Sequence, residues 1–193
     1  MKNLKNLLKK RVSLVLACVM VAALCVGMTG CSGESDEDVI REGVTAEFES
    51  IKNLEQEVLD DLVTSVEASG DMSMLGVDNE EFCRGLLEGF DYSVDEVVVD
   101  GDTATVKATM TCKNVSAILT SWTEDVTVFA ADPAVLEMTE DELYTEMGTM
   151  LMTTIGEAEL ISTQVELPYE KIDNTWQGTA EAETAITNAM LGQ

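Results

Sequence analysis

Apolar residues recur along the chain with two different periods, and each period predicts a different kind of element. From 39 to 69 the apolar positions follow the 3.6-residue period of a helix, and Gly70 provides a stop. The residues on that stripe are Val44, Phe48, Ile51, Val58, Leu62 and Val66. A second, shorter helix is expected over 79–89, because Asp78 can cap it and its apolar residues share one face.

The period changes to two in the segment 94–112, which reads VDEVVVDGDTATVKATMTC. Asp100-Gly101 is interpreted as the central pair of a type I′ turn, in which both residues need positive φ. In the strand after this turn, Thr and Lys residues alternate with one apolar face. That face holds Ala104, Val106, Ala108, Met110 and Cys112. The pattern predicts a hairpin with one buried and one solvated face.

A second hairpin is predicted nearer the C-terminus. Apolar and polar residues alternate over 160–169, and a turn is expected at Asp173-Asn174 before a short partner strand at 175–177. Pro168 indicates an edge or a bulge at that point of the sheet.

Helices are expected between the two hairpins. The segment 115–131 is predicted to form one helix, and Asp132-Pro133 provides the cap and first residue of another. Thr139 and Glu142 form a capping box for a further helix that runs to about 158.

A final helix is predicted over 180–191. Helices and hairpins that are segregated along the chain predict the α+β class, with an antiparallel sheet built from two hairpins and packed by helices. The segment 39–193 is long enough to bury its own core, so we expect it to form a single domain.

The first thirty residues are typical of an export signal. The chain begins with Lys and Arg residues, an uncharged and mostly apolar run occupies 12–28, and Gly30 precedes Cys31. An uncleaved anchor helix is the alternative, although the run is somewhat short of the roughly 20 apolar residues that a membrane-spanning helix needs.

The string Met28-Thr29-Gly30-Cys31 resembles the lipobox of bacterial lipoproteins, with Met28 in place of the usual leucine. The resemblance implies that the Cys31 sulfur receives a diacylglyceryl group, that the signal 1–30 is cleaved after Gly30, and that Cys31 becomes the N-terminus. Two acyl chains hold a protein stably at a bilayer. We therefore expect a chain anchored on the extracytoplasmic face of the cell membrane, with 31–38 as the lipidated cysteine and an acidic tether.

Charge narrows the possible partners. All 37 acidic residues lie after position 30, whereas only six of the 11 basic residues do, so the segment 31–193 has a net charge of −31. This charge argues against nucleic acid as a partner and against docking flat on anionic lipid. A solvated, soluble surface is the plainer interpretation, and attraction to cations or to a basic partner is the other.

Cysteine and histidine limit the chemistry. Cys83 and Cys112 remain in the exported domain, where they could form a disulfide or stay as two buried thiols on apolar faces. The chain has no histidine, which excludes Ser-His-Asp and Cys-His triads and argues against a catalytic zinc. A stripe that includes Met147 and Met150 is interpreted as core filler, with a soft ligand surface or a copper(I) site as the alternative. We expect no cofactor and no metal.

The segments 92–114 and 161–176 resemble parts of small lipoproteins of Gram-positive gut bacteria whose activity is not established. Those proteins look like the cystatin-like or NTF2-like roll, in which a sheet curls around a long helix. The resemblance covers most of the chain after Cys31 and implies this fold, but it brings no known active site.

The leading hypothesis for function is a non-catalytic ligand-binding or interaction module whose ligand or protein partner is unknown. The concave side of a curled sheet can hold a ligand, and aromatic side chains are the candidates to line it, although aromatic residues also simply pack in cores. The candidates are Tyr92, Trp122, Tyr169 and Trp176.

The alternative hypothesis is a carboxylate-dependent hydrolase at the cell surface. It would use paired acids such as Asp95/Glu96 or Asp100/Asp102 as acid and base, although neighbouring acids on an acidic surface are usually only solvated. Calcium binding is a third class. Because no EF-hand loop is present, only weak and diffuse binding of divalent cations is expected.

Overall fold

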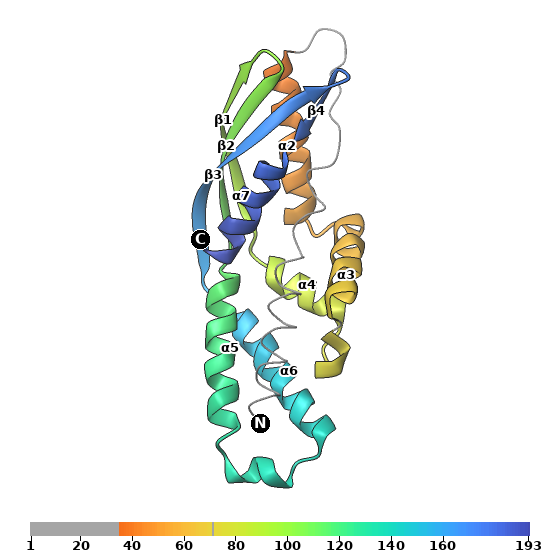
Figure 1. Cartoon of the computed structure of the whole chain (residues 1–193), viewed down its shortest axis with the longest axis vertical. Helices are drawn as coiled ribbons and strands as arrows, with labels where there is room; N and C mark the ends of the chain where they lie inside the picture. Colours follow the sequence, from red (N-terminus) through yellow and green to blue (C-terminus); the bar gives the residue numbers. More distant parts are fainter. Residues whose placement is uncertain (1–34, 71) are drawn as a thin grey trace.

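The structure is a computed structural model, and it describes residues 35–193 apart from residue 71. The predicted signal and the lipobox cysteine, Cys31, lie outside the described residues and stay predictions. The described chain has helices and one antiparallel sheet, which confirms the α+β class. The molecule is elongated, with the sheet at one end of its long axis and a pair of helices at the other (Figure 1).

Four strands form the sheet in the order β1-β2-β3-β4, each antiparallel to the next. They are β1 (Asp91–Asp100), β2 (Thr103–Lys113), β3 (Leu160–Ile172) and β4 (Thr175–Gly178). β2 and β3 pair continuously from Thr103↔Glu170 to Lys113↔Leu160, so the two predicted hairpins join into one meander.

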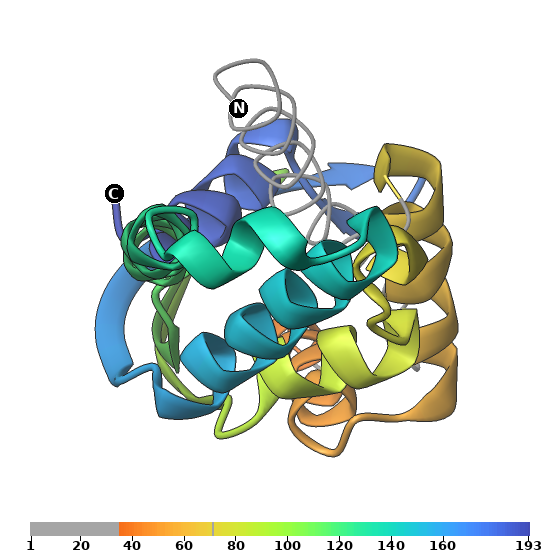
Figure 2. The ribbon, with the colours of Figure 1, turned by 90° about the horizontal axis from the view of Figure 1, so that it is seen from below.

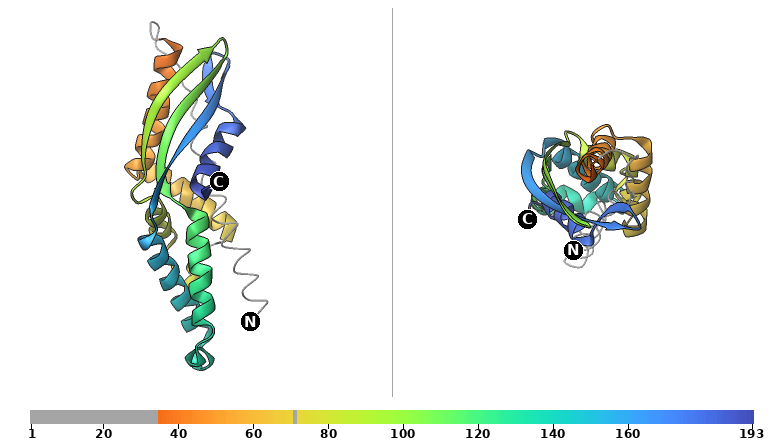
Figure 3. Two further views of the ribbon diagram at one scale, coloured as in Figure 1. Left: turned by 90° about the vertical axis from the view of Figure 1, so that its left-hand side faces the viewer. Right: turned by 90° about the horizontal axis from the view of Figure 1, so that it is seen from above.

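The helices lie on one face of the sheet and beyond its end. They are α2 (Asp36–Lys52), α3 (Gln56–Gly70), α4 (Asn79–Leu87), α5 (Val115–Phe129), α6 (Glu140–Glu157) and α7 (Ala180–Leu191), with short 3-10 helices η1 (Met72–Leu75) and η2 (Pro133–Glu137). α2 packs against β1 and α7 against β3, and the strands curve around these two helices (Figure 3). The predicted apolar face of β2, from Ala104 to Cys112, is buried under them.

The segment between β2 and β3 forms a helical arm (residues 115–157), made of α5, η2 and α6. The arm extends away from the sheet along the long axis of the molecule (Figure 1). α6 packs against α5 on one side and against α4 and η1 on the other, whereas α5 lies at the outside of the group (Figure 2).

The single helix predicted over 39–69 is wrong, because the chain forms two helices there. Leu54 has a φ of 52°, and the amides of Leu54 and Glu55 donate to the carbonyls of Ile51 and Ser50 at 3.1 and 3.0 Å. This is a Schellman ending, whose left-handed residue is usually glycine. Because leucine occupies that position, the sequence carries no recognisable stop signal between α2 and α3.

The tether predicted over 31–38 is too long, because α2 already begins at Asp36. Ser35 is the N-cap, and its hydroxyl accepts a hydrogen bond from the amide of Asp38 at 3.2 Å. The first turn contains Asp36, Glu37 and Asp38, whose negative charges are favourable at the positive end of the helix dipole. The acidic run therefore starts a helix.

The turn of the first hairpin lies one residue beyond the predicted position. Asp100 pairs with Thr103, so the central residues are Gly101 and Asp102, and Gly101 is the one of the two with positive φ, 62°. Glycine with positive φ at the first central position is the type II′ pattern, which also fits the twist of a hairpin.

The second hairpin has the predicted turn. Ile172 pairs with Thr175, and the two residues between them, Asp173 and Asn174, have φ of 51° and 64°. Positive φ at both central positions is what a type I′ turn requires. The strand before the turn continues to Ile172, three residues further than the sequence pattern indicated.

Predicted helix starts are confirmed at Asp78, which caps α4, and at Thr139 and Glu142, whose reciprocal capping box begins α6. The Asp132 side chain also caps the segment that follows it, but that segment is a 3-10 helix, η2, and not an α-helix.

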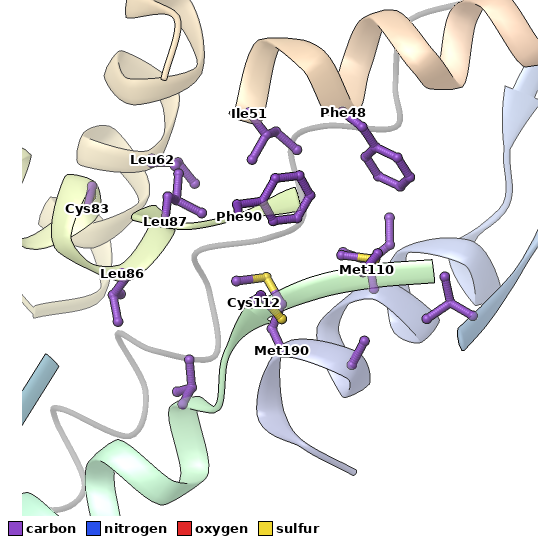
Figure 4. Packing of buried hydrophobic residues seen from close by; sticks show 14 of the residues in the cluster. Phe48, Ile51, Leu62, Cys83, Leu86, Leu87, Phe90, Met110, Cys112 and Met190 are labelled. Carbon is purple, nitrogen blue, oxygen red and sulfur yellow. The ribbon is translucent and has the colours of Figure 1, made fainter. Parts of the chain in front are cut away.

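One hydrophobic core joins the sheet to the helices (Figure 4). Phe48 of α2 meets Phe90 edge-on, with ring centroids 6.1 Å apart, and Met110 and Met190 approach them from β2 and α7 (Figure 4). Cys112 lies in the same region. Burial of this kind is the main source of stability in a domain of this size.

Cys83 and Cys112 are free, buried thiols, which is the second of the two alternatives that the sequence left open. They come from α4 and β2, and burial raises the pKa of each thiol to about 11. Since the thiolate is the reactive form, neither side chain is suited to nucleophilic chemistry near neutral pH.

Candidate functional site

The four aromatic residues that the sequence nominated do not gather at one site. Trp122 of α5 and Trp176 of β4 are buried, and their indole N–H groups already donate, to the Met147 carbonyl at 2.9 Å and to the Asp36 carboxylate at 3.0 Å. A buried indole with its donor satisfied packs the core and offers no polar handle to a ligand.

The two tyrosines lie at separate places on the sheet, because Tyr92 pairs with Met110 and Tyr169 with Ala104, six residues further back along β2. The Tyr92 hydroxyl is 2.9 Å from the Glu49 carboxylate and 3.1 Å from the Thr45 carbonyl. The Tyr169 hydroxyl is buried without a hydrogen-bond partner, and its pKa is raised by burial and by the negative charge of Glu47. The carboxyl group of Glu47 is likewise buried and without a hydrogen-bond partner, so two unsatisfied polar groups lie inside the core under α2.

The acidic pairs proposed for the hydrolase alternative lie on the exposed side of the sheet and in its first turn. Asp95 occupies a bulge in β1 and accepts hydrogen bonds from Ser93 and Thr109 at 2.7 and 2.8 Å, which lower the pKa of its carboxyl. Glu96 pairs with Lys107 at 2.8 Å. A lowered pKa suits a structural carboxylate better than a general acid.

A cleft lies instead along the helical arm, between α5 and α6. Its volume is about 790 Å³, within the usual range of ligand sites, and it reaches from the junction with the sheet to the far end of α5. The lining positions on α5 recur every three or four residues, as one face of a helix does: Ala117, Ile118, Ser121, Asp125, Val128 and Phe129. This cleft is the candidate functional site.

The floor and the rim of the cleft differ in chemistry. Apolar side chains such as Ile118, Met150 and Ile161 form the floor together with threonine hydroxyls, whereas acids line the rim. These acids are Asp125, Glu146, Glu157 and Glu159, and the lining contains no basic residue. Of the predicted methionine stripe, Met147 is core filler as expected, and Met150 packs partly against the core while it also lines the cleft.

The acids of the arm have no internal counterions. The six basic residues after Cys31 each form an ion pair with an acid outside the arm: Arg41–Glu37, Lys52–Asp91, Arg84–Glu80, Lys107–Glu96, Lys113–Glu88 and Lys171–Asp36. The arm itself contains nine acidic residues and no Lys or Arg. It therefore carries a net charge of −9 that no basic residue within it offsets, and its potential attracts cationic groups.

α5 also exposes apolar side chains. Only Val115, Ile118 and Trp122 are buried, whereas Ala117 and Val128 are exposed on another side of the helix, Val128 by 74%. Apolar positions on a surface helix normally pack against another element. The sequence contains this signal, but it could not tell which face of α5 would be left uncovered.

The part of the chain that the structure describes contains no group of three or more potential ligands that could hold a metal ion. Within the same residues, no helix combines the length and the apolar character needed to cross a membrane.

Comparison with known proteins does not identify a family for this chain. No protein-family model and no curated protein sequence matches it. Its structure is similar to the crystal structure of a Bacillus subtilis protein, YcdA, provisionally described as a lipoprotein, with 15% identity and a TM-score of 0.43. The match covers 95% of this chain but only 58% of YcdA. Because the identity and the TM-score are low, the similarity says nothing about the function of the site.

Proposed function

We propose that this protein is a lipid-anchored, non-catalytic binding module on the extracytoplasmic face of the cell membrane, and that it holds its helical arm away from the bilayer. The proposal joins the lipobox at Cys31 to the position of the arm. Cys31 lies four residues before Ser35, the N-cap of α2, and four residues span at most about 14 Å. The start of α2 would therefore lie next to the membrane.

The arm is at the opposite end of the molecule from that start (Figure 1). The first turn of α2 is held at the sheet end, because the Lys171 ammonium donates to the Asp36 carboxylate at 2.7 Å and the Lys171 amide to the Asp102 carbonyl at 2.8 Å. β2 and α5 follow one another along the long axis and together span roughly 60 Å. This separation is the observation that carries the proposal.

Two further features support an anchored module that stands off the membrane. A diacylglyceryl group supplies the two acyl chains that stable anchoring needs. The acidic surface of the domain would be repelled by anionic lipid, which favours an upright position. The curvature of the sheet around α2 agrees with the cystatin-like or NTF2-like roll that the sequence resembles, and we propose that relationship as well.

Binding is favoured over the hydrolase alternative by the state of the carboxylates. Asp95 and Glu96 are already engaged by Ser93, Thr109 and Lys107, whereas the acids of the open α5–α6 cleft pair with none of the six basic residues after Cys31.

Energy transfer from the protein to labelled lipid tests the proposal. The lipidated protein is reconstituted in vesicles that carry an acceptor dye on their headgroups, with a donor attached at Leu136→Cys in the arm or at Asp102→Cys in the first hairpin turn. Both positions are exposed, and the two native thiols are buried with raised pKa, so the donor attaches to the introduced cysteine. The intact mass first verifies the diacylglyceryl group on Cys31.

We expect strong transfer from position 102 and weak transfer from position 136. Equal transfer from both positions would mean that the molecule lies flat, and stronger transfer from position 136 would mean that the arm faces the bilayer; either result overturns the proposed orientation. A protein that carries no acyl mass and stays in the supernatant when vesicles are sedimented would overturn the anchor itself.

A further inference from the structure

We propose that the α5–α6 cleft is a docking groove for a cationic amphipathic helix of a partner protein, which would lie along the arm and complete a three-helix bundle with α5 and α6. The inference names the partner class for the module proposed above and rests on that function.

The shape of the site favours a helix over a small molecule. The lining residues extend along α5 from Ala117 to Phe129 and along α6 from Glu146 to Glu157, with the spacing of helix faces. A groove between two helices that follows their length is the form in which proteins receive an amphipathic helix, with anchors at i, i+3, i+4 and i+7. A small cation would need only one end of it.

The apolar floor defines the inner face of the partner. Phe129, Met150 and Ile161 are partly exposed and offer aromatic, thioether and aliphatic contacts, and Val128 is exposed at the far end of the groove. Methionine adapts to different partner side chains because it is flexible and polarisable. A Leu- or Ile-rich face is therefore the complement of this floor.

The rim defines the charge of the partner. Asp125 lies on the α5 side, and Glu146 and Glu157 lie on the α6 side, so both edges of the groove are acidic. Because the arm contains no base, these acids have no local partner of their own. Lys and Arg on the flanks of a docked helix would neutralise the rim, speed association and exclude acidic competitors. A second copy of this chain is a poor occupant, since the two arms would repel one another.

Calorimetric titration of the mature lipidated protein, residues 31–193, in detergent tests the inference. The probe is a peptide of about four helical turns, made of Leu and Lys with Leu at the i, i+3, i+4 and i+7 positions. Three controls accompany it: a scrambled peptide of the same composition, the same helix with Glu in place of Lys, and the small cation spermidine.

The test variant is Ala117→Lys/Val128→Lys, which places two positive charges in the groove at exposed positions of α5. Its matched control is Ala46→Lys/Ala68→Lys, the same charge change at exposed positions of α2 and α3. Because all four side chains are exposed, both variants should fold, and circular dichroism verifies this.

We expect one molecule of the Leu/Lys helix to bind per protein, with affinity that falls as salt is added. Binding should weaken at least about tenfold in the groove variant and less than about threefold in the control variant. The scrambled and the acidic peptides should bind at least about tenfold more weakly than the helix.

Several outcomes would overturn the inference. Equal binding of the scrambled peptide, or equal loss in the two variants, would mean diffuse attraction to an acidic surface. Displacement of the peptide by stoichiometric spermidine would show that the cleft binds a small cation. Absence of binding would show that the cleft does not receive a cationic helix. These failures leave the anchoring and orientation intact, since the energy-transfer experiment tests them separately.

Discussion

The indole of Trp176 donates a hydrogen bond of 3.0 Å to the carboxylate of Asp36, although the two residues are 140 positions apart. The same carboxylate accepts from the Lys171 ammonium at 2.7 Å, and these hydrogen bonds lower the pKa of Asp36. The first turn of α2 is thus joined to the β3–β4 hairpin at the end where the lipid anchor would lie.

Replacement of Asp36 by asparagine should lower the melting temperature more than Glu42→Gln, a change of equal charge at an exposed position of α2. Because the folded state lowers the pKa of Asp36 from 3.8, its contribution is present above pH 3.8 and is lost as pH falls through the lower folded value. The difference between wild type and variant should therefore persist down to pH 3.8 and vanish only in stronger acid. A gap that is the same at every pH would show that the charge of Asp36 is not involved.

Glu47 should make the protein less stable as pH rises. Burial without a partner raises the pKa of its carboxyl from 4.5 to about 8, so the folded state holds a proton that the unfolded state releases near pH 4.5. The free energy of unfolding should fall between pH 5 and pH 8 through this group. Glu47→Gln should be more stable than wild type by about 2 to 4 kcal/mol at pH 8, and by little at pH 4.

Chemical denaturation across this pH range measures the effect, with Glu42→Gln as the exposed control. The Tyr169 hydroxyl stays neutral over this pH range, because burial and the charge of Glu47 both raise its pKa. Parallel stability curves for wild type and Glu47→Gln would contradict the prediction.

Two glycines of α6 should respond in opposite ways to alanine. A Cβ on Gly148 would overlap the Leu75 carbonyl and press on Val77, whereas a Cβ on Gly156 would meet nothing. Gly148→Ala should therefore destabilise the protein by about 2 kcal/mol or more, since the backbone of η1 must move. Gly156→Ala should stabilise it by about 0.5 to 1 kcal/mol, because alanine favours the helix. Thermal melts of both variants check this; equal effects would mean that α6 does not pack tightly on η1.

Cys83 and Cys112 should be unreactive in the native protein. Both are free and buried, and the pKa of each is raised to about 11. A maleimide reagent at neutral pH should add nothing to either thiol in the native protein, and should modify both after denaturation. An intact mass two hydrogens lighter that reverts on reduction would instead indicate the disulfide that the sequence also allowed.

Much of the fold could be read from residues close together in the sequence. The alternation from Ala104 to Cys112 identified the buried face of β2, and Thr139 with Glu142 located the start of α6. These predictions succeeded because strand alternation, caps and tight turns depend on interactions within a few residues. The break at Leu54 was missed because it does not follow from neighbouring residues: a leucine at positive φ is strained and is held there by tertiary packing.

The sequence by itself determined the acidic charge, the absence of histidine, the two hairpins with helices between them, and the run of nine acids without a Lys or Arg between 115 and 157. Only the tertiary structure decided that the four nominated aromatics do not share one site, that every basic residue after Cys31 pairs outside the arm, and that one face of α5 stays uncovered. The physical reason is that hydrophobic burial and ion pairing act between residues that are close in space but far apart in the sequence. The spacing of neighbouring residues does not show which distant residues will meet.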